Sequence, residues 1–238
     1  MQIHKKSLTS EELEKLFAYP VIIERTKRKK TASIEIKDGV IRVLVPRTLS
    51  EKRIDALIKK RSEWINKKIR LQAEMPPYRS KEYVNGETFT YLGRNYRLKL
   101  VNNDTTSTRL KSGYLEVPAQ GEKAIHASLT DWYTSHALAK LEEKTGRYAK
   151  TLNVEPSSVT VKEYKSRWGS CSTSGDITYN WRIIMAPHRI VDYVVIHELC
   201  HLVELNHSDK YWKQVESLVP DYRERRAWLK TNANTLAI

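Results

Sequence analysis

The pattern of apolar and polar positions predicts a strand-rich first part of the chain. Three segments alternate or run apolar as half-buried strands do: residues 21–24, 33–37 and 40–45. Between the last two, Asp38-Gly39 predicts a tight hairpin turn. Residues 51–72 then show a helical period after a capping Ser50. The apolar stripe of this helix consists of Ile54, Leu57, Ile58, Trp64, Ile65 and Ile69.

After this helix the sequence predicts two hairpins first and mostly helices later in the chain. Gly93-Arg94 and Ser112-Gly113 predict two hairpin turns, flanked by strands at 87–92, 95–101, 108–110 and 114–117. The later elements are a long helix at 122–150, strands at 159–163 and 177–181, and helices at 187–203, 209–218 and 221–233. This succession predicts an α+β protein in which a strand-rich N-terminal part accompanies a mostly helical C-terminal part.

Eleven residues near the C-terminus, HELCHLVELNH from His197 to His207, carry the clearest chemical signal. His197 and His201 are four residues apart, so on a helix both imidazoles can reach one metal ion. Glu198 lies beside them, where it can take a proton from a water on that metal. The preceding run, IVDYVVI, is almost continuously apolar and predicts a buried helix, in which His and Glu need partners. A third nitrogen from His207 leaves one coordination position open, which is typical of a catalytic Zn²⁺.

The third ligand requires a break in the helix. On a continuous helix His207 would project about 240° away from the face that carries His201. We therefore expect the chain to turn between Leu202 and Asn206, with Asn206 in a left-handed conformation, and to begin a new helix after Ser208. If the chain turns another way, the third ligand would be a carboxylate of Glu204, Glu216 or Glu224.

The loop between the predicted strands 159–163 and 177–181 is the next candidate for substrate contact. Arg167 could neutralise a carboxylate or phosphate or stabilise an oxyanion, and Gly169 allows close approach of the backbone. Strand 177–181 is expected to be an edge strand that pairs with an extended substrate. The predicted substrate-binding residues are Arg167, Trp168, Ser170 and Asn180. The alternative is an Arg-Trp stack that only packs the loop.

Three runs of sequence closely resemble one known family: KSRWGSCSTSGDITYNWRIIMAP, VDYVVIHELCHLVELNHSDKYWKQV and PDYRERRAWLK. They resemble the YgjP-like metallopeptidase family, which is related to the WLM and SprT-like zincins. The resemblance is strongest over residues 158–230. It implies a zincin-like catalytic region with His197, His201 and His207 on the metal and Glu198 as general base. This chain has Tyr211 where the family often has Phe.

Charge is unevenly distributed along the chain. Residues 1–123 hold 27 Lys and Arg against 15 Asp and Glu, whereas residues 124–238 hold 15 against 13. We therefore predict a basic, strand-rich N-terminal region, 1–121, and a zincin-like metallohydrolase domain, 122–238. The densest basic run, from Arg25 to Lys30, is expected at a hairpin tip, where it could contact nucleic acid or a nucleotide. The alternative is a solvated surface that binds nothing.

Composition narrows the setting and the function. Two cysteines, Cys171 and Cys200, no apolar N-terminal leader and no 18-residue apolar span predict a cytoplasmic protein with free thiols and no membrane partner. The leading hypothesis is a zinc metallopeptidase acting on a peptide or protein. A second is a metal-dependent hydrolase of phosphoanhydrides such as nucleoside triphosphates, suggested by Arg167 and the basic N-terminal half. A third is a nucleic-acid-associated binding protein whose metal site is structural.

Overall fold

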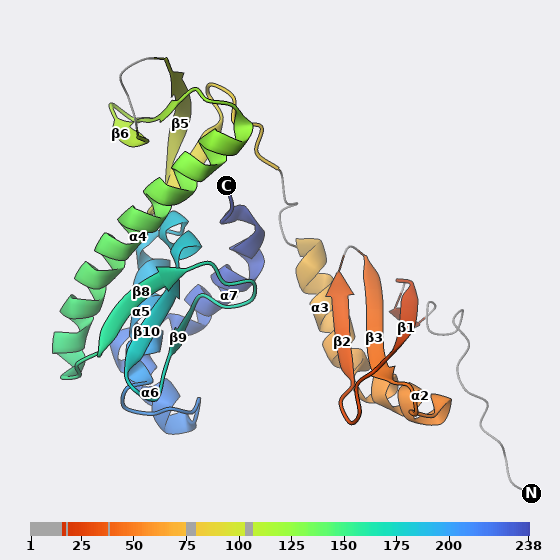
Figure 1. Cartoon of the computed structure of the whole chain (residues 1–238). Helices are drawn as coiled ribbons and strands as arrows, with labels where there is room; N and C mark the ends of the chain where they lie inside the picture. The colour runs from red at the N-terminus through yellow and green to blue at the C-terminus, as the bar shows by residue number, and fades with distance from the viewer. Residues whose placement is uncertain (1–15, 18, 38, 75–79, 103–106) are drawn as a thin grey trace, which may run out of the picture. The chain divides into compact units, whose positions relative to one another are not determined.

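The computed structural model describes residues 16–17, 19–37, 39–74, 80–102 and 107–238 (Figure 1). The chain forms two compact units, Met1–Met75 and Pro76–Ile238. The predicted boundary at 121/122 lies inside the second unit, because packing divides the chain at a different place from charge. The assignment of separate functions to 1–121 and 122–238 stays a prediction.

The first unit packs two helices with a three-stranded sheet. Strand β3 (Val40–Pro46) lies between β1 (Val21–Thr26), to which it is parallel, and β2 (Ser33–Lys37), to which it is antiparallel. The β2–β3 hairpin around Gly39 is confirmed, with Lys37 paired to Val40. Alternate residues of β3 and one face of the helices form the core, with Ile41, Val43, Val45, Ile54, Ile58 and Ile65 fully buried.

Two expectations for this unit are wrong. The predicted helix 51–72 is divided at Arg61 into α2 (Glu51–Lys60) and α3 (Ser62–Glu74). The division changes the helical phase, so that Trp64 is 40% exposed instead of buried. The basic run is also not a hairpin tip, because β1 and β2 are not neighbours: both pair with β3, and the chain between them crosses the end of that strand.

The second unit contains two sheets. The first has the order β4-β5-β7-β6, from β4 (Thr88–Tyr91), β5 (Arg94–Val101), β6 (Arg109–Lys111) and β7 (Tyr114–Pro118). Both predicted hairpins are present: β4 and β5 turn at Leu92-Gly93, one residue earlier than expected, and β6 and β7 turn at Ser112-Gly113. All four turn residues have positive φ, as a two-residue turn of this kind requires.

The second sheet has the order β8-β10-β9, from β8 (Ser158–Lys162), β9 (Gly169–Cys171) and β10 (Asp176–Asn180). Strand β10 is parallel to β8 and antiparallel to β9. The predicted edge strand 177–181 is therefore the central strand, and this expectation is wrong. The edge strands are β8 and β9, and β9 is a three-residue strand within the segment expected to be a loop.

Helices complete the second unit. The long α4 (Glu122–Leu152) precedes β8, and the short η1 (Trp181–Met185) follows β10. The motif helix α5 (His188–Cys200), α6 (Asp209–Leu218), α7 (Tyr222–Asn232) and η2 (Ala233–Thr235) end the chain. No helix among the residues placed in the structure is long and apolar enough to cross a membrane.

The first sheet of this unit and the motif helix share one hydrophobic core. Phe89, Leu98 and Leu115 from the sheet belong to the same buried cluster as Ile190 and Val194 of α5. The β4–β5 turn also contacts the start of α5, since a Cβ on Gly93 would lie 2.8 Å from the Cα of Pro187. These contacts place strands β4–β7 in the same unit as the motif helix.

Candidate metal centre

Helix α5 places two imidazoles and one carboxylate at its C-terminal end. Its apolar residues, Ile190, Val191, Val194, Val195 and Ile196, are buried, as the sequence predicts. His197 and His201 are half-buried, and their ring centroids lie 5.2 Å apart. Glu198 is only 5% exposed. The spacing of the motif thus directs both imidazoles toward one region of the surface and holds Glu198 below it.

The chain turns after α5, as the third histidine requires. The N–H groups of residues 201–203 bond to carbonyl groups three residues earlier, at 3.0 to 3.2 Å, which tightens the end of the helix. Ser208 then caps α6, and its Oγ accepts a hydrogen bond from the Tyr211 N–H at 3.2 Å. The expected left-handed conformation at Asn206 is wrong, since its φ is not positive. The tightened turn ends the helix instead.

This turn brings three imidazoles together. One ring nitrogen from each of His197, His201 and His207 forms a group whose atoms all lie within 4.8 Å of one another. The Nε2 atoms of His197 and His207 are 3.2 Å apart. Two nitrogens that each bind a tetrahedral Zn²⁺ at 2.0–2.1 Å are separated by roughly 3.3 Å. The spacing and the donor type therefore fit a metal ion. The alternative ligands Glu204, Glu216 and Glu224 are not part of this group.

Hydrogen bonds orient two of the imidazoles. The buried Tyr211 hydroxyl donates to the backbone carbonyl of His197 at 2.8 Å, so it accepts from the Nδ1–H of the same residue at 2.7 Å. The Nδ1–H of His201 donates to the carbonyl of Glu204 at 3.2 Å. A proton on each Nδ1 leaves the Nε2 lone pair free for a metal. The Tyr211 hydroxyl is the group that a Phe at this position would lack.

Burial keeps the imidazoles neutral. Burial, together with smaller effects of the His201, His207 and Arg226 charges, lowers the pKa of His197 to about 3. Burial is also the main cause of the lowered pKa values of His201 and His207. A metal binds the neutral imidazole, so these shifts favour binding at neutral pH. Burial raises the pKa of Glu198 to about 8, and the nearby charge of Arg167 opposes that rise.

Glycine at position 169 gives Glu198 its space. A Cβ on Gly169 would lie 2.6 Å from Glu198 Oε1, 2.7 Å from its Cγ and 2.8 Å from its Cδ. The close backbone approach predicted for Gly169 is therefore present, and the partner is the motif glutamate. Strand β9 and helix α5 meet at this contact, so β9 borders the candidate site.

The free edge of β9 faces away from β10. The bonds from Asn180 N to Trp168 O and from Ser172 N to Asp176 O, at 2.8 and 2.9 Å, set the alternation of the antiparallel pair. By that alternation the backbone of Ser170 faces β10, whereas the backbone groups of Gly169 and Cys171 face outward. An extended peptide can pair with such an edge, which moves the predicted substrate edge from β10 to β9.

The four predicted substrate-binding residues have different surroundings. Arg167 is exposed and lies 5.5 Å from the ring of Tyr164, and Trp168 is half-buried against the core. The Ser170 hydroxyl is 2.6 Å from the Tyr164 hydroxyl. Asn180 is 3% exposed: its amide group donates to the carbonyls of Tyr164 and Arg167, and its side-chain oxygen accepts from Arg182 N. The polar atoms of Asn180 therefore hold the loop, rather than facing a substrate.

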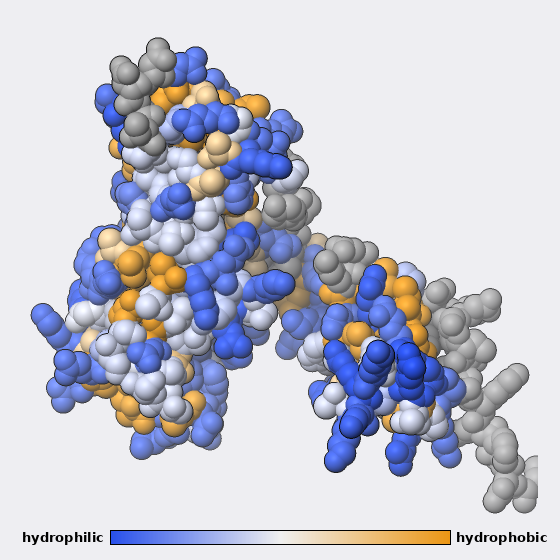
Figure 2. Space-filling model, in the orientation of Figure 1, coloured by the Kyte–Doolittle hydropathy of each residue, from blue (hydrophilic) through white to orange (hydrophobic). Residues whose placement is uncertain are grey.

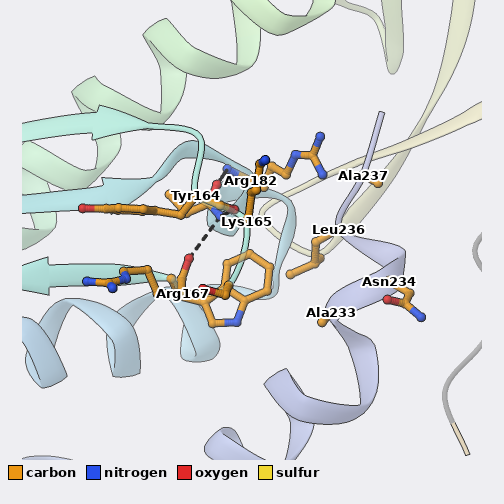
Figure 3. Close-up of a pocket in the computed structure, with 11 residues that line it drawn as sticks. Tyr164, Lys165, Arg167, Arg182, Ala233, Asn234, Leu236 and Ala237 are labelled. Atoms are coloured by element: carbon orange, nitrogen blue, oxygen red, sulfur yellow. Dashed lines mark hydrogen bonds between the residues drawn. The ribbon is translucent and has the colours of Figure 1, made fainter. Parts of the chain in front are cut away.

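A cavity of about 290 Å³ lies beside this loop (Figure 3). It is lined by Tyr164, Lys165, Ser166, Arg167, Trp168, Asn180, Arg182, Ala233, Asn234, Leu236 and Ala237. None of the three histidines nor Glu198 lines it. In Figure 3 the side chains of Tyr164 and Arg167 extend away from Ala233–Ala237, so they point away from the cavity. The cavity is therefore not part of the group formed by the three histidines and Glu198.

Two residues near the centre were missed in the sequence. Tyr211 orients His197, and its only signal was its position just after the Ser208 cap. Arg226 lies with its guanidinium 5.0 Å from the Trp212 ring, which stacks on His207 at 5.4 Å. The run PDYRERRAWLK contains three arginines, and no local pattern distinguishes the one that approaches the site. Both positions depend on how α6 and α7 pack against α5.

Known proteins that are similar to this chain include one family and two solved structures. The family described as "YgjP-like, metallopeptidase domain" matches residues 30–232. No curated protein matched the sequence. Among solved structures, the metallopeptidase zymogen of Pyrococcus abyssi abylysin is 24% identical, with 38% of this chain and 93% of that chain covered and a TM-score of 0.35. The metallopeptidase zymogen of Methanocaldococcus jannaschii jannalysin is 19% identical, with 38% and 91% covered and a TM-score of 0.33.

The family match spans most of the chain, including the motif helix, β9 and the turn that carries His207. Membership implies a metal and a protein substrate, and the three convergent imidazoles are a donor set that a metal requires. The chain belongs to the YgjP-like family of metallopeptidases.

Proposed function

We propose that the protein is a zinc-dependent peptidase in which His197, His201 and His207 hold the metal and Glu198 is the general base. The observation that carries this proposal is the convergence of three neutral imidazoles next to a buried carboxylate. Three nitrogen ligands suit Zn²⁺ and leave one position for catalysis. When bound, Zn²⁺ supplies a Lewis acid that acidifies a water molecule and polarises the peptide carbonyl.

The residues of the chain supply the remaining steps. Glu198 takes the proton of the attacking water through a carboxylate oxygen and then passes it to the leaving amine. Its raised pKa suits this second transfer, and a divalent cation nearby favours the carboxylate form needed for the first. Tyr211 and the Glu204 carbonyl hold His197 and His201 in the tautomer that binds metal.

The substrate binds beside β9 in this proposal. Its backbone pairs with the outward-facing groups of Gly169 and Cys171, next to Glu198. The guanidinium of Arg167, next to the Tyr164 ring, contacts polar groups of the substrate. Trp168 packs against the hydrophobic core and holds the start of β9 in place. Ser170 fixes the loop through Tyr164.

Metal content and turnover together test the assignment. Elemental analysis of purified protein should find one zinc per chain, and His197→Ala, His201→Ala and His207→Ala should each lose most of it. Glu198→Gln should keep the metal and lose roughly 10²–10⁴-fold in hydrolysis of an unstructured protein substrate. Normal zinc content in all three histidine variants would refute the ligand set, and normal turnover in Glu198→Gln would refute the base.

A second function concerns the basic N-terminal part. Lys27, Arg28, Lys29 and Lys30 are all exposed, and the first unit carries 19 Lys and Arg against 10 Asp and Glu. In Figure 2 long hydrophilic side chains project from the end of this unit where the β1–β2 connection lies in Figure 1. Arg25 is engaged, since it donates to the carbonyls of Arg47 and Leu49. We propose that the four exposed residues contact a polyanion such as nucleic acid.

Anisotropy with labelled single-stranded RNA tests this second function. Replacing residues 27–30 with Gln should weaken binding, and fourfold more salt should reduce wild-type affinity roughly tenfold if a few phosphates are contacted. Lys67→Gln with Lys68→Gln, on α3 of the same unit, is the control for loss of charge. Equal binding by wild-type protein and the 27–30 variant would leave this surface without a nucleic-acid role. Parallel assays with nucleoside triphosphates test the alternative hydrolase activity.

Cellular location forms the last part of the proposal. Cys171 and Cys200 are both free thiols. Unpaired cysteines, one of them buried in the motif helix, suit a reducing compartment. We place the protein in the cytoplasm, which fractionation of the source cells would test.

A further inference from the structure

Arginines from two separate segments lie close to the metal centre. Arg226, on α7, lies with its guanidinium 5.0 Å from the ring of Trp212. The Trp212 ring stacks on His207 at 5.4 Å and is 5.9 Å from the ring of His197. Arg226 and two of the three histidines therefore share Trp212 as a common neighbour.

Arg167 approaches the site from the loop before β9. Its guanidinium is 5.5 Å from the ring of Tyr164, and both side chains point away from the cavity in Figure 3. The Tyr164 hydroxyl bonds to Ser170 on β9. Gly169, between Arg167 and Ser170 in the chain, contacts Glu198. Arg167 is therefore anchored beside the strand edge that borders the general base.

Neither arginine forms a salt bridge within the described part of the chain, and the charge of Arg167 reaches the Glu198 carboxylate only without direct contact. Neighbouring arginines differ in this respect: Arg223 pairs with Glu216 at 2.7 Å, and Arg225 pairs with Asp221 at 2.8 Å. A guanidinium over an aromatic ring without an ion pair keeps N–H groups available, and these match the two oxygens of a carboxylate. Arg167 and Arg226 are thus held in place by rings, with their donors free for a ligand.

We propose that Arg167 and Arg226 form two carboxylate-binding subsites and that the enzyme prefers peptides with acidic side chains on both sides of the cleaved bond. The inference rests on the proposed peptidase function, since it places the peptide between the β9 edge and α7. A cationic metal beside the two guanidinium groups adds to the attraction of an acidic segment. An acidic substrate supplies the partners that both arginines lack.

Two peptides that differ only in charge test the proposal. One carries Glu on each side of the cleaved bond, and the other carries Gln at the same two positions. Wild-type protein should cleave the Glu peptide with a kcat/KM about tenfold higher, as expected for two exposed ion pairs worth about 0.7 kcal/mol each. Arg167→Gln and Arg226→Gln should each reduce the Glu/Gln ratio by about threefold or more. Arg226→Lys should retain part of it.

Binding provides a readout that is independent of turnover. Labelled Glu and Gln peptides are titrated against Glu198→Gln, alone and combined with Arg167→Gln or Arg226→Gln. The same preference should appear in Kd and disappear in the combined variants. Arg223→Gln is the matched control, because it removes the same charge from α7 without removing a contact to Trp212.

The outcomes separate the subsites from the catalytic proposal. Equal kcat/KM and equal Kd for the two peptides would overturn the subsites and leave the peptidase intact. A loss of preference in Arg223→Gln as large as in Arg226→Gln would also overturn them, because general charge would then explain the effect. A binding preference without cleavage of either peptide supports the subsites and refutes the peptidase. ATP is added as a competitor. If it displaces the Glu peptide at ATP concentrations below the Kd of that peptide, phosphates and not carboxylates are recognised, and the proposal is overturned.

Discussion

Replacing Gly169 with alanine should disable the general base while leaving the fold intact. The added Cβ would lie 2.6 Å from Glu198 Oε1, whereas ordinary contact begins at 3.4 Å. The carboxylate must therefore move by about 0.8 Å, and a misplacement of about 1 Å costs on the order of 10²-fold in rate. Gly169 does not have a positive φ, so alanine is compatible with its backbone. Reduced freedom of the unfolded chain alone would stabilise the protein by about 0.4–1 kcal/mol.

The measurements are kcat/KM on an unstructured substrate, zinc content and thermal unfolding. Gly169→Ala should lose about 10²-fold in kcat/KM and keep its zinc, because the three histidines are not displaced. Gly146→Ala on α4 is the control, since a Cβ there meets no atom within 4 Å. Alanine at position 198 lacks the Cγ, Cδ and Oε1 atoms of the clash, so adding Gly169→Ala to Glu198→Ala should cost little more activity than Glu198→Ala alone.

One result would refute this reasoning directly. If Gly169→Ala retains kcat/KM within about twofold of wild type, then Glu198 either moves freely or does not act as the base. A loss of zinc or a large fall in unfolding temperature would show that the strand, rather than the carboxylate, had been displaced.

Three further predictions follow from the buried polar groups. Tyr211→Phe should weaken zinc binding about tenfold, measured by competition with a chelator, without a change in fold, because only the hydroxyl that orients His197 is removed. Asp192→Ala should lower the free energy of unfolding in urea by about 3 kcal/mol, since it leaves Lys144 buried without its partner at 2.6 Å, and Lys144→Met should cost less. Burial raises the pKa of Cys200 to about 12 and also raises that of Cys171, so little thiolate exists at pH 7.5. Iodoacetamide should therefore label native protein slowly and urea-unfolded protein rapidly, and fast labelling of the native protein at pH 7.5 would contradict this explanation.

Local patterns predicted the parts of the molecule that depend on nearby residues. The motif helix, the turn after His201 and the Ser208 cap all follow from side chains within a dozen positions, and all three are present. Both two-residue hairpin turns of the second unit were also predicted, one of them a residue too late, because glycine readily adopts the positive φ that such turns need. The convergence of the three imidazoles could be predicted for the same reason: they lie on one short stretch of chain.

Non-local pairing was not predictable. Strand β9 has three residues and no periodic signal, and the central place of β10 depends on its parallel pairing with β8 across the intervening loop. The unit boundary was hidden for a related reason. Lys and Arg lie mostly on the surface, so their distribution along the chain does not reveal which elements share a core. The apolar sides of β4–β7 pack with α4 and α5. Arg226 and Tyr211 reach the site through helix packing, which no spacing in the sequence describes.

The short distance along the chain between the three proposed ligand histidines has a consequence for folding. His197, His201 and His207 lie within eleven consecutive residues, so the ion closes loops of only four and six residues. The entropy lost on loop closure grows by about 0.6 kcal/mol for each doubling of length, so ligands eighty residues apart would cost about 2 kcal/mol more to assemble. Loops this small close within tens of nanoseconds, long before β8 and β10 can find each other. A metal bound by these three histidines would therefore be captured by the nascent helix and turn, before the two sheets and α7 assemble.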